Sequence, residues 1–218
     1  MNVLVIDTAL EACAVGIARE GAPPILRSEI IGRGHAERLF GLVEDALAEA
    51  KLQLADFGRL GVTTGPGSFT GIRVGVAAVR GFALVTGAEG VGHSTLAVHA
   101  WTARAQVGAS PVLAVLPAKG GAFFAQLFDP DGAAMEDPLV ALPDDLADRA
   151  MRAGASLAGA GAEEIARDGI AIAHTRTTPE LAALLAMTQA GHPGATPPRP
   201  VYVKPPDAAP AKPQIARR

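Results

Sequence analysis

Asp7 and Thr8 are the first residues that could do chemistry, because they place a carboxylate and a hydroxyl directly after the apolar run of residues 3–6. A loop that cradles phosphate usually supplies glycines and a lysine. The three residues that follow here read Ala-Leu-Glu, so they supply neither and add a negative charge. We therefore expect an Asp/Thr turn whose side chains bond to the local backbone, and no high-affinity phosphate site.

Ser68 is a second candidate, because a serine on a sharp glycine turn can be an exposed nucleophile. It lies in the run Gly-Pro-Gly-Ser-Phe-Thr-Gly, between a short apolar strand and a helix. Glycine allows backbone angles closed to other residues, and proline fixes its own φ. A hydroxyl here can accept a bond from a free N–H of the first helical turn. We therefore expect Ser68 or Thr70 to cap the helix. The expected structural turn consists of Gly65, Pro66, Gly67, Ser68 and Thr70.

The composition excludes several classes of protein. A net charge of −3 over 218 residues argues against a large basic surface for nucleic acid. The single cysteine, Cys13, excludes an internal disulfide framework and a multi-thiolate zinc site. No segment reads as having the apolar length of a membrane span, and the chain enters a strand without a basic leader. We expect a soluble, cytoplasmic protein with no membrane partner.

The hydrophobic pattern predicts mixed strands and helices in the first half of the chain. Apolar runs bounded by turn residues predict strands at 3–6, 12–18, 25–31, 60–63 and 90–92. Apolar residues at helical spacing predict helices at 35–50, 71–85 and 94–106. The spacing of the second and third strands is typical of a hairpin.

A second half begins near residue 111. It contains predicted strands at 112–116, 122–128, 156–159 and 170–173, and predicted helices at 143–153, 162–167 and 179–190. From residue 191 the composition becomes Pro-rich and polar, which is typical of a tail. The expected domains are a first lobe at 1–108, a smaller lobe at 109–190 and a tail at 191–218. The tail should lie extended on the body around Tyr202 and be loose beyond Asp207.

Two helices carry apolar faces that need a neighbour. Helix 35–50 has one apolar stripe, whereas helix 71–85 is apolar almost all round and should be covered on more than one side. One face of helix 71–85 consists of very small residues. Another backbone can come close to it, either from the chain's own sheet or from a partner. The expected partner interface consists of Leu39, Phe40, Val43, Leu47, Gly71, Arg73, Gly75, Ala78 and Phe82.

Five segments, in the same order along the chain, resemble the TsaB (formerly YeaZ) family. The longest is the run Gly-Pro-Gly-Ser-Phe-Thr-Gly-Ile-Arg-Val-Gly that ends at Gly75. The others are Leu-Val-Ile-Asp-Thr at 4–8, His-Ala-Glu-Arg-Leu at 35–39, Gly-His-Ser-Thr-Leu at 92–96 and Pro-Val-Tyr-Val-Lys-Pro-Pro-Asp-Ala at 200–208. The resemblance is dense up to about residue 100. This family supplies the dimerisation subunit of the bacterial complex that makes threonylcarbamoyladenosine in tRNA.

The resemblance implies an α/β protein with the actin-like ATPase (ASKHA, ribonuclease H-like) fold, in two mixed-sheet lobes of which the second is reduced. In that superfamily a carboxylate and a hydroxyl after the first strand face a nucleotide phosphate and its magnesium. Asp7 and Thr8 are therefore the nucleotide-binding candidates.

The catalytic relative in the complex carries a His-x-x-x-His pair, which can bind one metal ion from one helix face. Here the comparable stretch keeps only His99, with Thr95 four residues before it. A single imidazole does not hold a metal. The sequence therefore predicts no metal site and no catalytic residue.

Two functional hypotheses follow. In the first, the chain is a non-catalytic subunit that binds and activates a homologous, TsaD-like catalytic subunit. That subunit transfers a threonylcarbamoyl group to adenosine 37 of tRNAs that read codons beginning with A. In the second, the chain is itself an ATP-dependent transferase or hydrolase of the actin-like fold. The missing histidine pair and phosphate loop favour the first hypothesis.

The partners follow from the resemblance. It implies a heterodimer with the TsaD-like subunit and a TsaE-like ATPase in the assembled complex. The uncovered faces of helices 35–50 and 71–85 predict a homodimer of the isolated chain, and the net charge of −3 predicts only indirect contact with tRNA. No cofactor is expected to bind tightly, while ATP or ADP with magnesium in the assembled complex stays open.

Overall fold

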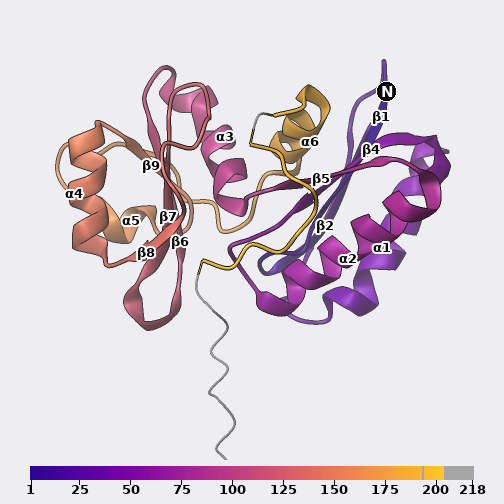
Figure 1. Ribbon diagram of the computed structural model, residues 1–218, viewed down its shortest axis with the longest axis horizontal. Coiled ribbons are helices and arrows are strands. Elements are labelled where there is room, and N and C mark those ends of the chain that lie inside the picture. The colour runs from indigo at the N-terminus through magenta and orange to yellow at the C-terminus, as the bar shows by residue number, and fades with distance from the viewer. Residues whose placement is uncertain (193, 204–218) are drawn as a thin grey trace, which may run out of the picture.

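Two five-stranded sheets stand side by side in the computed structural model, which describes residues 1–192 and 194–203 (Figure 1). The first sheet contains β1 (Asn2–Asp7), β2 (Ala12–Ala18), β3 (Ile25–Ile30), β4 (Phe57–Thr63) and β5 (Glu89–His93). The second contains β6 (Val112–Pro117), β7 (Phe123–Phe128), β8 (Leu139–Ala141), β9 (Ser156–Ala158) and β10 (Ile172–His174).

Both sheets have the same topology. The strand orders are β3-β2-β1-β4-β5 and β10-β9-β6-β7-β8. In each sheet the first three strands pair antiparallel and the last two add in parallel on the other side of the first strand. This repeated mixed sheet is the ribonuclease H-like, actin-like arrangement, so the predicted fold class is confirmed. The second lobe is the reduced one, since β8, β9 and β10 have three residues each.

Strand β1 lies at the centre of the first sheet, and its apolar run follows from that position. Residues 3–6 are fully buried, as expected for a strand covered on both faces. Leu4 and Ile6 point into the core beneath two helices, while Val3 and Val5 point into a separate core on the opposite face. Alternation along the strand thus divides its side chains between two cores.

Six helices cover these faces in the described part of the chain: α1 (His35–Ala50), α2 (Phe69–Thr86), α3 (Thr95–Val107), α4 (Pro143–Ala153), α5 (Ala162–Ile165) and α6 (Leu181–Ala190). Helices α1 and α2 pack on one face of the first sheet, and α6 packs on the other. Helices α4 and α5 cover the outer face of the second sheet, and α3 its inner face. Figure 1 shows α3 and α6 between the two sheets.

The domain boundaries at 108 and 190 stay a prediction, but two helices pack across them. Helix α3, assigned to the first lobe, packs on the second sheet. Helix α6, assigned to the second lobe, packs on the first sheet against Val3 and Val5. Both helices also contact each other. An apolar helix pattern shows that a helix is covered, but it does not show which sheet covers it, so the sequence order misplaced both.

Helix α2 also corrects the expectation that no segment has the apolar length of a membrane span. It has 18 residues and a mean hydropathy of 1.4, so by length and composition alone it could cross a membrane. The core helix of a folded domain meets the same test, and Ile72, Val76 and Val79 on its inner face are buried in the core of the first sheet. Its outer face is exposed.

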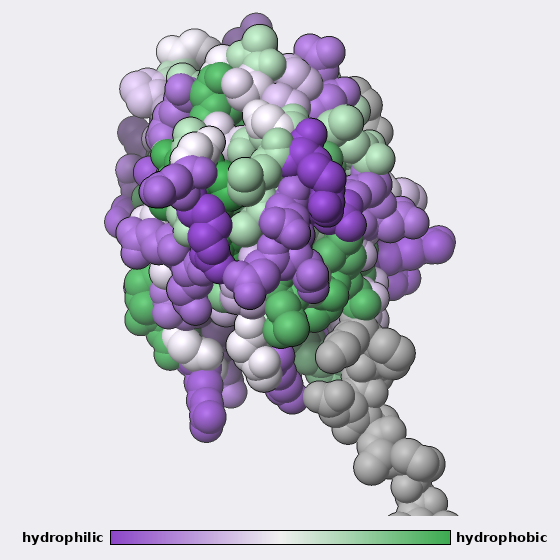
Figure 2. Space-filling model, turned by 90° about the vertical axis from the view of Figure 1, so that its left-hand side faces the viewer, coloured by the Kyte–Doolittle hydropathy of each residue, from purple (hydrophilic) through white to green (hydrophobic). Residues whose placement is uncertain are grey.

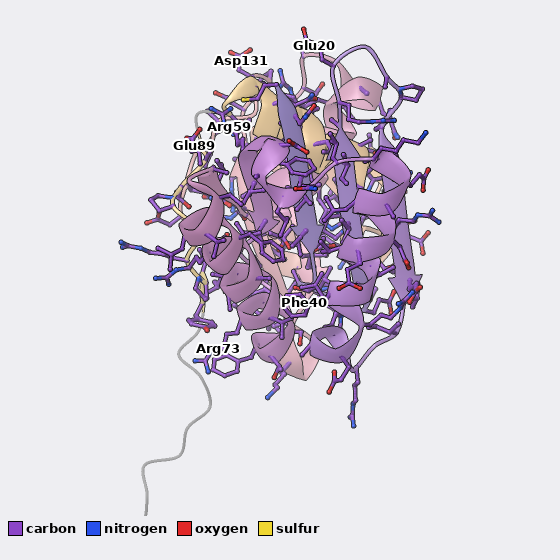
Figure 3. The ribbon with its side chains drawn as sticks, turned by 90° about the vertical axis from the view of Figure 1, so that its right-hand side faces the viewer. Glu20, Phe40, Arg59, Arg73, Glu89 and Asp131 are labelled. Carbon is purple, nitrogen blue, oxygen red and sulfur yellow. The ribbon has the colours of Figure 1, made fainter. Side chains whose placement is uncertain are left out.

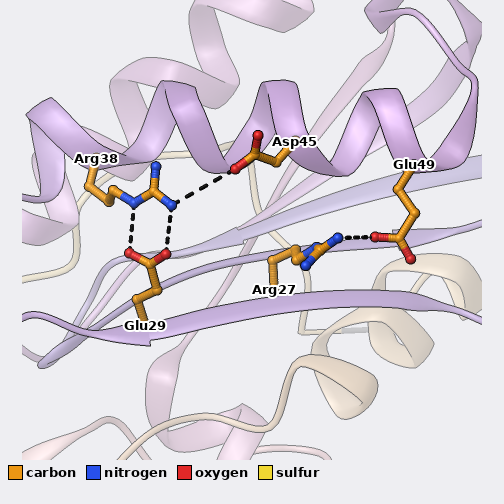
Figure 4. A network of polar contacts seen from close by, with 5 residues as sticks. All are labelled: Arg27, Glu29, Arg38, Asp45 and Glu49. Carbon is orange, nitrogen blue, oxygen red and sulfur yellow. Dashed lines mark hydrogen bonds and ion pairs between the residues drawn. The ribbon is translucent and has the colours of Figure 1, made fainter.

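Ion pairs hold α1 over the edge strand β3 (Figure 4). Arg38 binds Glu29 through two hydrogen bonds, Nε to Oε2 at 2.7 Å and Nη2 to Oε1 at 2.6 Å. Arg27 of β3 pairs with Glu49 near the other end of α1. Exposed ion pairs contribute little stability, but a two-pronged arginine–carboxylate pair fixes orientation. The contacts therefore help to set which face of α1 points outward.

The small face of α2 packs on the chain's own backbone. A Cβ at Gly71 would lie 2.1 Å from the carbonyl oxygen of Thr8, and one at Gly75 would lie 2.5 Å from the Thr8 hydroxyl oxygen. Ala78 is buried in the same core. The assignment of Gly71, Gly75 and Ala78 to a partner interface is therefore wrong. The small glycines of α2 allow the loop after β1 to pack closely against the helix.

Two glycine substitutions in α2 test this packing. In Gly71→Ala the new methyl meets backbone rather than a movable side chain, so the free energy of unfolding should fall by about 1–3 kcal/mol. Gly81→Ala is the matched control, because nothing lies within 4 Å of a Cβ there. It should raise the free energy of unfolding by about 0.5–1 kcal/mol. Urea unfolding measures both, and effects of the same sign would contradict the packing.

Candidate functional site

The turn after β4 has a structural role. Ser68 precedes α2, and its hydroxyl accepts a hydrogen bond from the N–H of Gly71 at 3.3 Å, so the predicted cap is confirmed. Gly65 has a φ of 107°, which favours glycine. A Cβ at Gly67 would lie 2.1 Å from the carbonyl oxygen of Ala9. The turn is thus shaped to lie against the loop after β1, and Thr70 falls inside the helix instead of capping it.

Asp7 and Thr8 are both buried, with 1% of each exposed. The Thr63 hydroxyl donates to Asp7 Oδ1 at 2.5 Å, and the N–H of Ala9 donates to the same oxygen at 3.1 Å. The Thr8 hydroxyl donates to the carbonyl of Gly71 at 2.7 Å. Burial raises the pKa of Asp7 and outweighs these hydrogen bonds. The Ala9 contact is the local bonding that the turn interpretation predicts. Thr63 and Gly71 are distant in the sequence, and the other carboxylate oxygen of Asp7, Oδ2, has no hydrogen-bond partner in the described structure.

An open cleft of about 430 Å³ lies between the lobes beside this turn. Its lining residues are Leu10, Glu11, Gly32, Ser68, Leu116, Pro117, Ala160 and Thr177. Glu11 is the charged side chain among them, and no lysine or arginine joins it. Phosphate needs cations or convergent N–H donors. The lining therefore does not fit the phosphates of ATP or ADP.

Buried histidines lie where the two lobes meet. His99 on α3 is fully buried, and neither of its ring nitrogens has a hydrogen-bond partner in the described structure. The His174 ring lies 5.5 Å from it and approaches the His99 carbonyl oxygen through Nε2 at 3.0 Å. His93 Nε2 lies 3.1 Å from the Thr188 hydroxyl oxygen. Burial lowers the pKa of His99 to about 3 and that of His93 to about 4.

These groups do not form a metal site. Among residues 1–192 and 194–203, no three histidine, cysteine or carboxylate side chains gather closely enough to hold an ion. His99 and Thr95 share one face of α3, as their spacing predicts, and both have unpartnered side-chain atoms. Their chemistry is that of neutral groups packed between the lobes.

The outer face of α1 and α2 exposes apolar side chains (Figure 3). Phe40 is 52% exposed and meets the ring of Phe82 edge to face, with 6.1 Å between ring centres. Leu84 and Val85 are 87% and 85% exposed. Exposed apolar side chains make this face a candidate contact surface. We call Phe40, Phe69, Phe82, Leu84 and Val85 the outer apolar face.

This face corrects the predicted interface. Leu39 and Val43 are buried in the chain's own core, so these two are not free for a partner. Leu47 is partly buried at the margin of that core. Phe40 and Arg73 are exposed, and Phe82 is partly so. The sequence reasoning missed Leu84 and Val85. Their signal was present, because Leu84 and Val85 extend the apolar run at the C-terminal end of α2 beyond Arg80.

The far end of the second lobe has a different surface. Figure 2 shows mainly hydrophilic residues there, with scattered apolar ones. Helix α4 carries Asp144, Asp145 and Asp148, and its exposed apolar residue is Met151. Single exposed apolar residues are ordinary on protein surfaces. This end of the molecule therefore provides a control for the outer apolar face.

The buried histidines predict that stability falls in acid. Folded His99 stays neutral down to about pH 3, whereas an unfolded histidine takes up a proton below about pH 6.5. The unfolded state then binds more protons, so the free energy of unfolding decreases as the pH falls below about 6.5. Each such histidine contributes a slope of up to about 1.4 kcal/mol per pH unit. Asp7 acts in the opposite direction, because its raised pKa gives stability that is lost as the pH rises above 3.8.

Urea unfolding at pH 7, 6 and 5 of the parent protein and His99→Leu tests this. The variant removes one buried titrating group and leaves the backbone carbonyl that His174 contacts. Its free energy of unfolding should depend less steeply on pH. Parallel pH profiles would contradict a neutral, buried His99.

Comparisons with known proteins agree with this architecture. The family model described as "TsaD: tRNA N6-adenosine threonylcarbamoyltransferase" matches residues 27–188. TsaB, the tRNA threonylcarbamoyladenosine biosynthesis protein of Escherichia coli (strain K12), is 38% identical over 121 residues, which is 56% of this chain and 52% of that protein. A tRNA N6-adenosine threonylcarbamoyltransferase of Ruegeria sp. (strain TM1040) is 46% identical over 76 residues, 35% of this chain and 21% of that protein. The chain thus spans about half or less of these curated relatives.

Among solved structures, YeaZ from Pseudomonas aeruginosa superposes with a TM-score of 0.77 at 27% identity, over 92% of this chain and 99% of that one. A second structure, described as an uncharacterized protein with similarity to peptidase YEAZ from the same organism, gives 0.78 over 93% and 99%. Because the family model covers most of its length, the chain belongs to the tRNA N6-adenosine threonylcarbamoyltransferase family, and its resemblance to the TsaB (YeaZ) proteins is confirmed.

Proposed function

We propose that this chain is a non-catalytic, cytoplasmic subunit in the synthesis of threonylcarbamoyladenosine at position 37 of tRNAs that read codons beginning with A. It binds and activates a homologous, TsaD-like catalytic subunit. The observation that carries the proposal is the outer apolar face, where Leu84 and Val85 are almost fully exposed. Membership of the family supports the place in tRNA modification.

The cleft supports the non-catalytic part of the proposal. Transfer of an acyl group from an adenylate requires cations or N–H donors at the leaving phosphate. The lining here offers a carboxylate from Glu11, the hydroxyls of Ser68 and Thr177, and apolar side chains, but no lysine or arginine. The hydroxyl of Thr8 and the carboxylate of Asp7 are buried, and Thr8 and one oxygen of Asp7 are hydrogen-bonded within the protein. ATP or ADP with magnesium is accordingly assigned to the assembled complex.

The other partners follow from the same surface. The isolated chain pairs with a second copy through the outer apolar face, because an uncovered apolar surface associates in water. In the complex this face is taken by the TsaD-like subunit. A TsaE-like ATPase joins the assembled complex, and the net charge of −3 fits a subunit that meets tRNA only indirectly.

Leu84→Asp tests the interface. A buried leucine contributes about 1.5–3 kcal/mol, so loss of that contact should weaken binding to a purified TsaD-like subunit at least tenfold. Met151→Asp is the control, since Met151 is exposed on α4 of the other lobe and should bind like the parent. Calorimetry gives the affinities and circular dichroism gives the melting temperatures. Equal binding by both variants would exclude the outer apolar face as the interface.

Asp7→Asn tests the non-catalytic role. Asparagine keeps the shape of the side chain and can still accept the hydrogen bonds from Thr63 and Ala9. The reconstituted complex should therefore modify tRNA within a few-fold of the parent rate. A loss of several orders of magnitude, with partner binding intact, would identify Asp7 as catalytic and favour an enzyme active in its own right.

A further inference from the structure

After α6 the chain returns across the first lobe as an extended segment, residues 194–203, which we call the C-terminal strap (Figure 1). Thr196 exchanges two backbone hydrogen bonds with Gly92 of β5, at 2.6 and 3.0 Å. The N–H of Val201 donates to the carbonyl of Thr64 at 2.8 Å. The strap is thus tied to the sheet on one side and reaches the start of α2 on the other.

Tyr202, at the end of the strap, lies beside the first turns of α2. The Tyr202 ring lies 5.2 Å from that of Phe69, centre to centre. Arg73 Nε donates to the Tyr202 hydroxyl at 2.9 Å, and the guanidinium carbon lies 3.7 Å from the centre of the Phe69 ring. The arginine is therefore held by one hydrogen bond and one aromatic face, which reduces the entropy that it loses on binding.

Arg73 remains able to bind an anion. Figure 3 shows it at the exposed end of α2, away from the core. No carboxylate of residues 1–192 or 194–203 pairs with it. Its hydrogen bond uses Nε, so the two terminal nitrogens keep their donors free in the described structure. A guanidinium that presents two parallel donors matches a carboxylate.

A groove of about 420 Å³ begins at this arginine and runs between α2 and the strap. Its lining consists of Arg73, Val76, Ala77, Arg80 and Pro200. Arg80 also has no ion pair among the described residues. The groove therefore combines two cations with a small apolar floor, and it adjoins the outer apolar face on the same helix.

We propose that this groove holds a carboxylate-bearing segment of the protein partner, with Arg73 as the binding anchor and Tyr202 as the residue that positions it. The inference rests on the proposed function and deepens it by assigning the chemistry of the partner. A short segment that offers one or two acidic side chains and an apolar side chain for the floor at Ala77 fits the site.

The surroundings favour a protein over other occupants. Phosphates of a nucleic acid would meet Arg73 and Arg80, but the adjoining Leu84 and Val85 have no counterpart in a nucleic-acid backbone. The remainder of this chain, residues 204–218, contains four basic residues and one acidic residue, so its charge repels the two arginines. A carboxylate on an apolar protein surface satisfies both parts of the site.

The test uses the full chain and a purified TsaD-like subunit, with affinities measured by calorimetry at low and high salt. Arg73→Gln should bind at least tenfold more weakly at low salt and show a flatter salt dependence. Arg152→Gln, an exposed arginine on α4, is the matched control and should bind like the parent. All three proteins should melt at similar temperatures, because both arginines are exposed.

Tyr202→Phe tests whether Tyr202 acts by positioning Arg73 or only by packing against Phe69. Phenylalanine keeps the ring contact with Phe69 and loses the hydroxyl that holds Arg73. It should weaken binding about threefold in the parent and have no further effect in Arg73→Gln, since Tyr202 then has nothing to position. A purely structural tyrosine would give equal effects in both backgrounds, which would overturn its role.

The outcomes distinguish this inference from the proposed function. If the parent does not bind the TsaD-like subunit, both fail. If the parent binds and Arg73→Gln binds equally well, the groove assignment alone is overturned. Titration of both proteins with tRNA and with magnesium ATP completes the test. Loss of either interaction in Arg73→Gln, with partner binding unchanged, would make the site a phosphate site and overturn the carboxylate assignment.

Discussion

The close contact between α2 and the loop after β1 is the constraint on which the first lobe depends. A backbone carbonyl at Thr8 occupies the space that a side chain at Gly71 would need, and the Thr8 hydroxyl bonds back to the Gly71 carbonyl. The cap at Ser68 and the glycine turn before it place the helix start at this point. Because the contact is made by backbone, it leaves little freedom for α2 to tilt or rotate.

The contact between α2 and the loop after β1 determines which side chains are buried and which are exposed. It buries Asp7 and Thr8 beneath the helix start, where the Thr8 hydroxyl and one carboxylate oxygen of Asp7 are hydrogen-bonded within the protein. The same rotation of α2 that points its glycines inward points Leu84 and Val85 outward. Leu84 and Val85 are part of the outer apolar face. Arg73 and the C-terminal strap add a charged end to that surface.

The space between the two sheets is filled by helices α3 and α6 (Figure 1). Helices α3 and α6 each cover the sheet of the other half of the chain, so the two lobes share a core that neither completes alone. His99 and His174 pack within this shared region, and burial keeps His99 neutral at physiological pH. The lobes are consequently joined by packing as well as by the chain.

The sequence by itself determined the elements, their order and the family. Apolar runs and glycine turns located nearly all the strands, although the short edge strand β8 has too few residues to show a pattern. The cap at Ser68 and the lack of phosphate-binding groups near Asp7 were also readable from residue types. Only the tertiary structure decided which face of α2 is inside, because its apolar pattern runs almost all round the helix. It also decided that Tyr202 meets Arg73, since 129 residues separate them and no local pattern encodes so distant a contact.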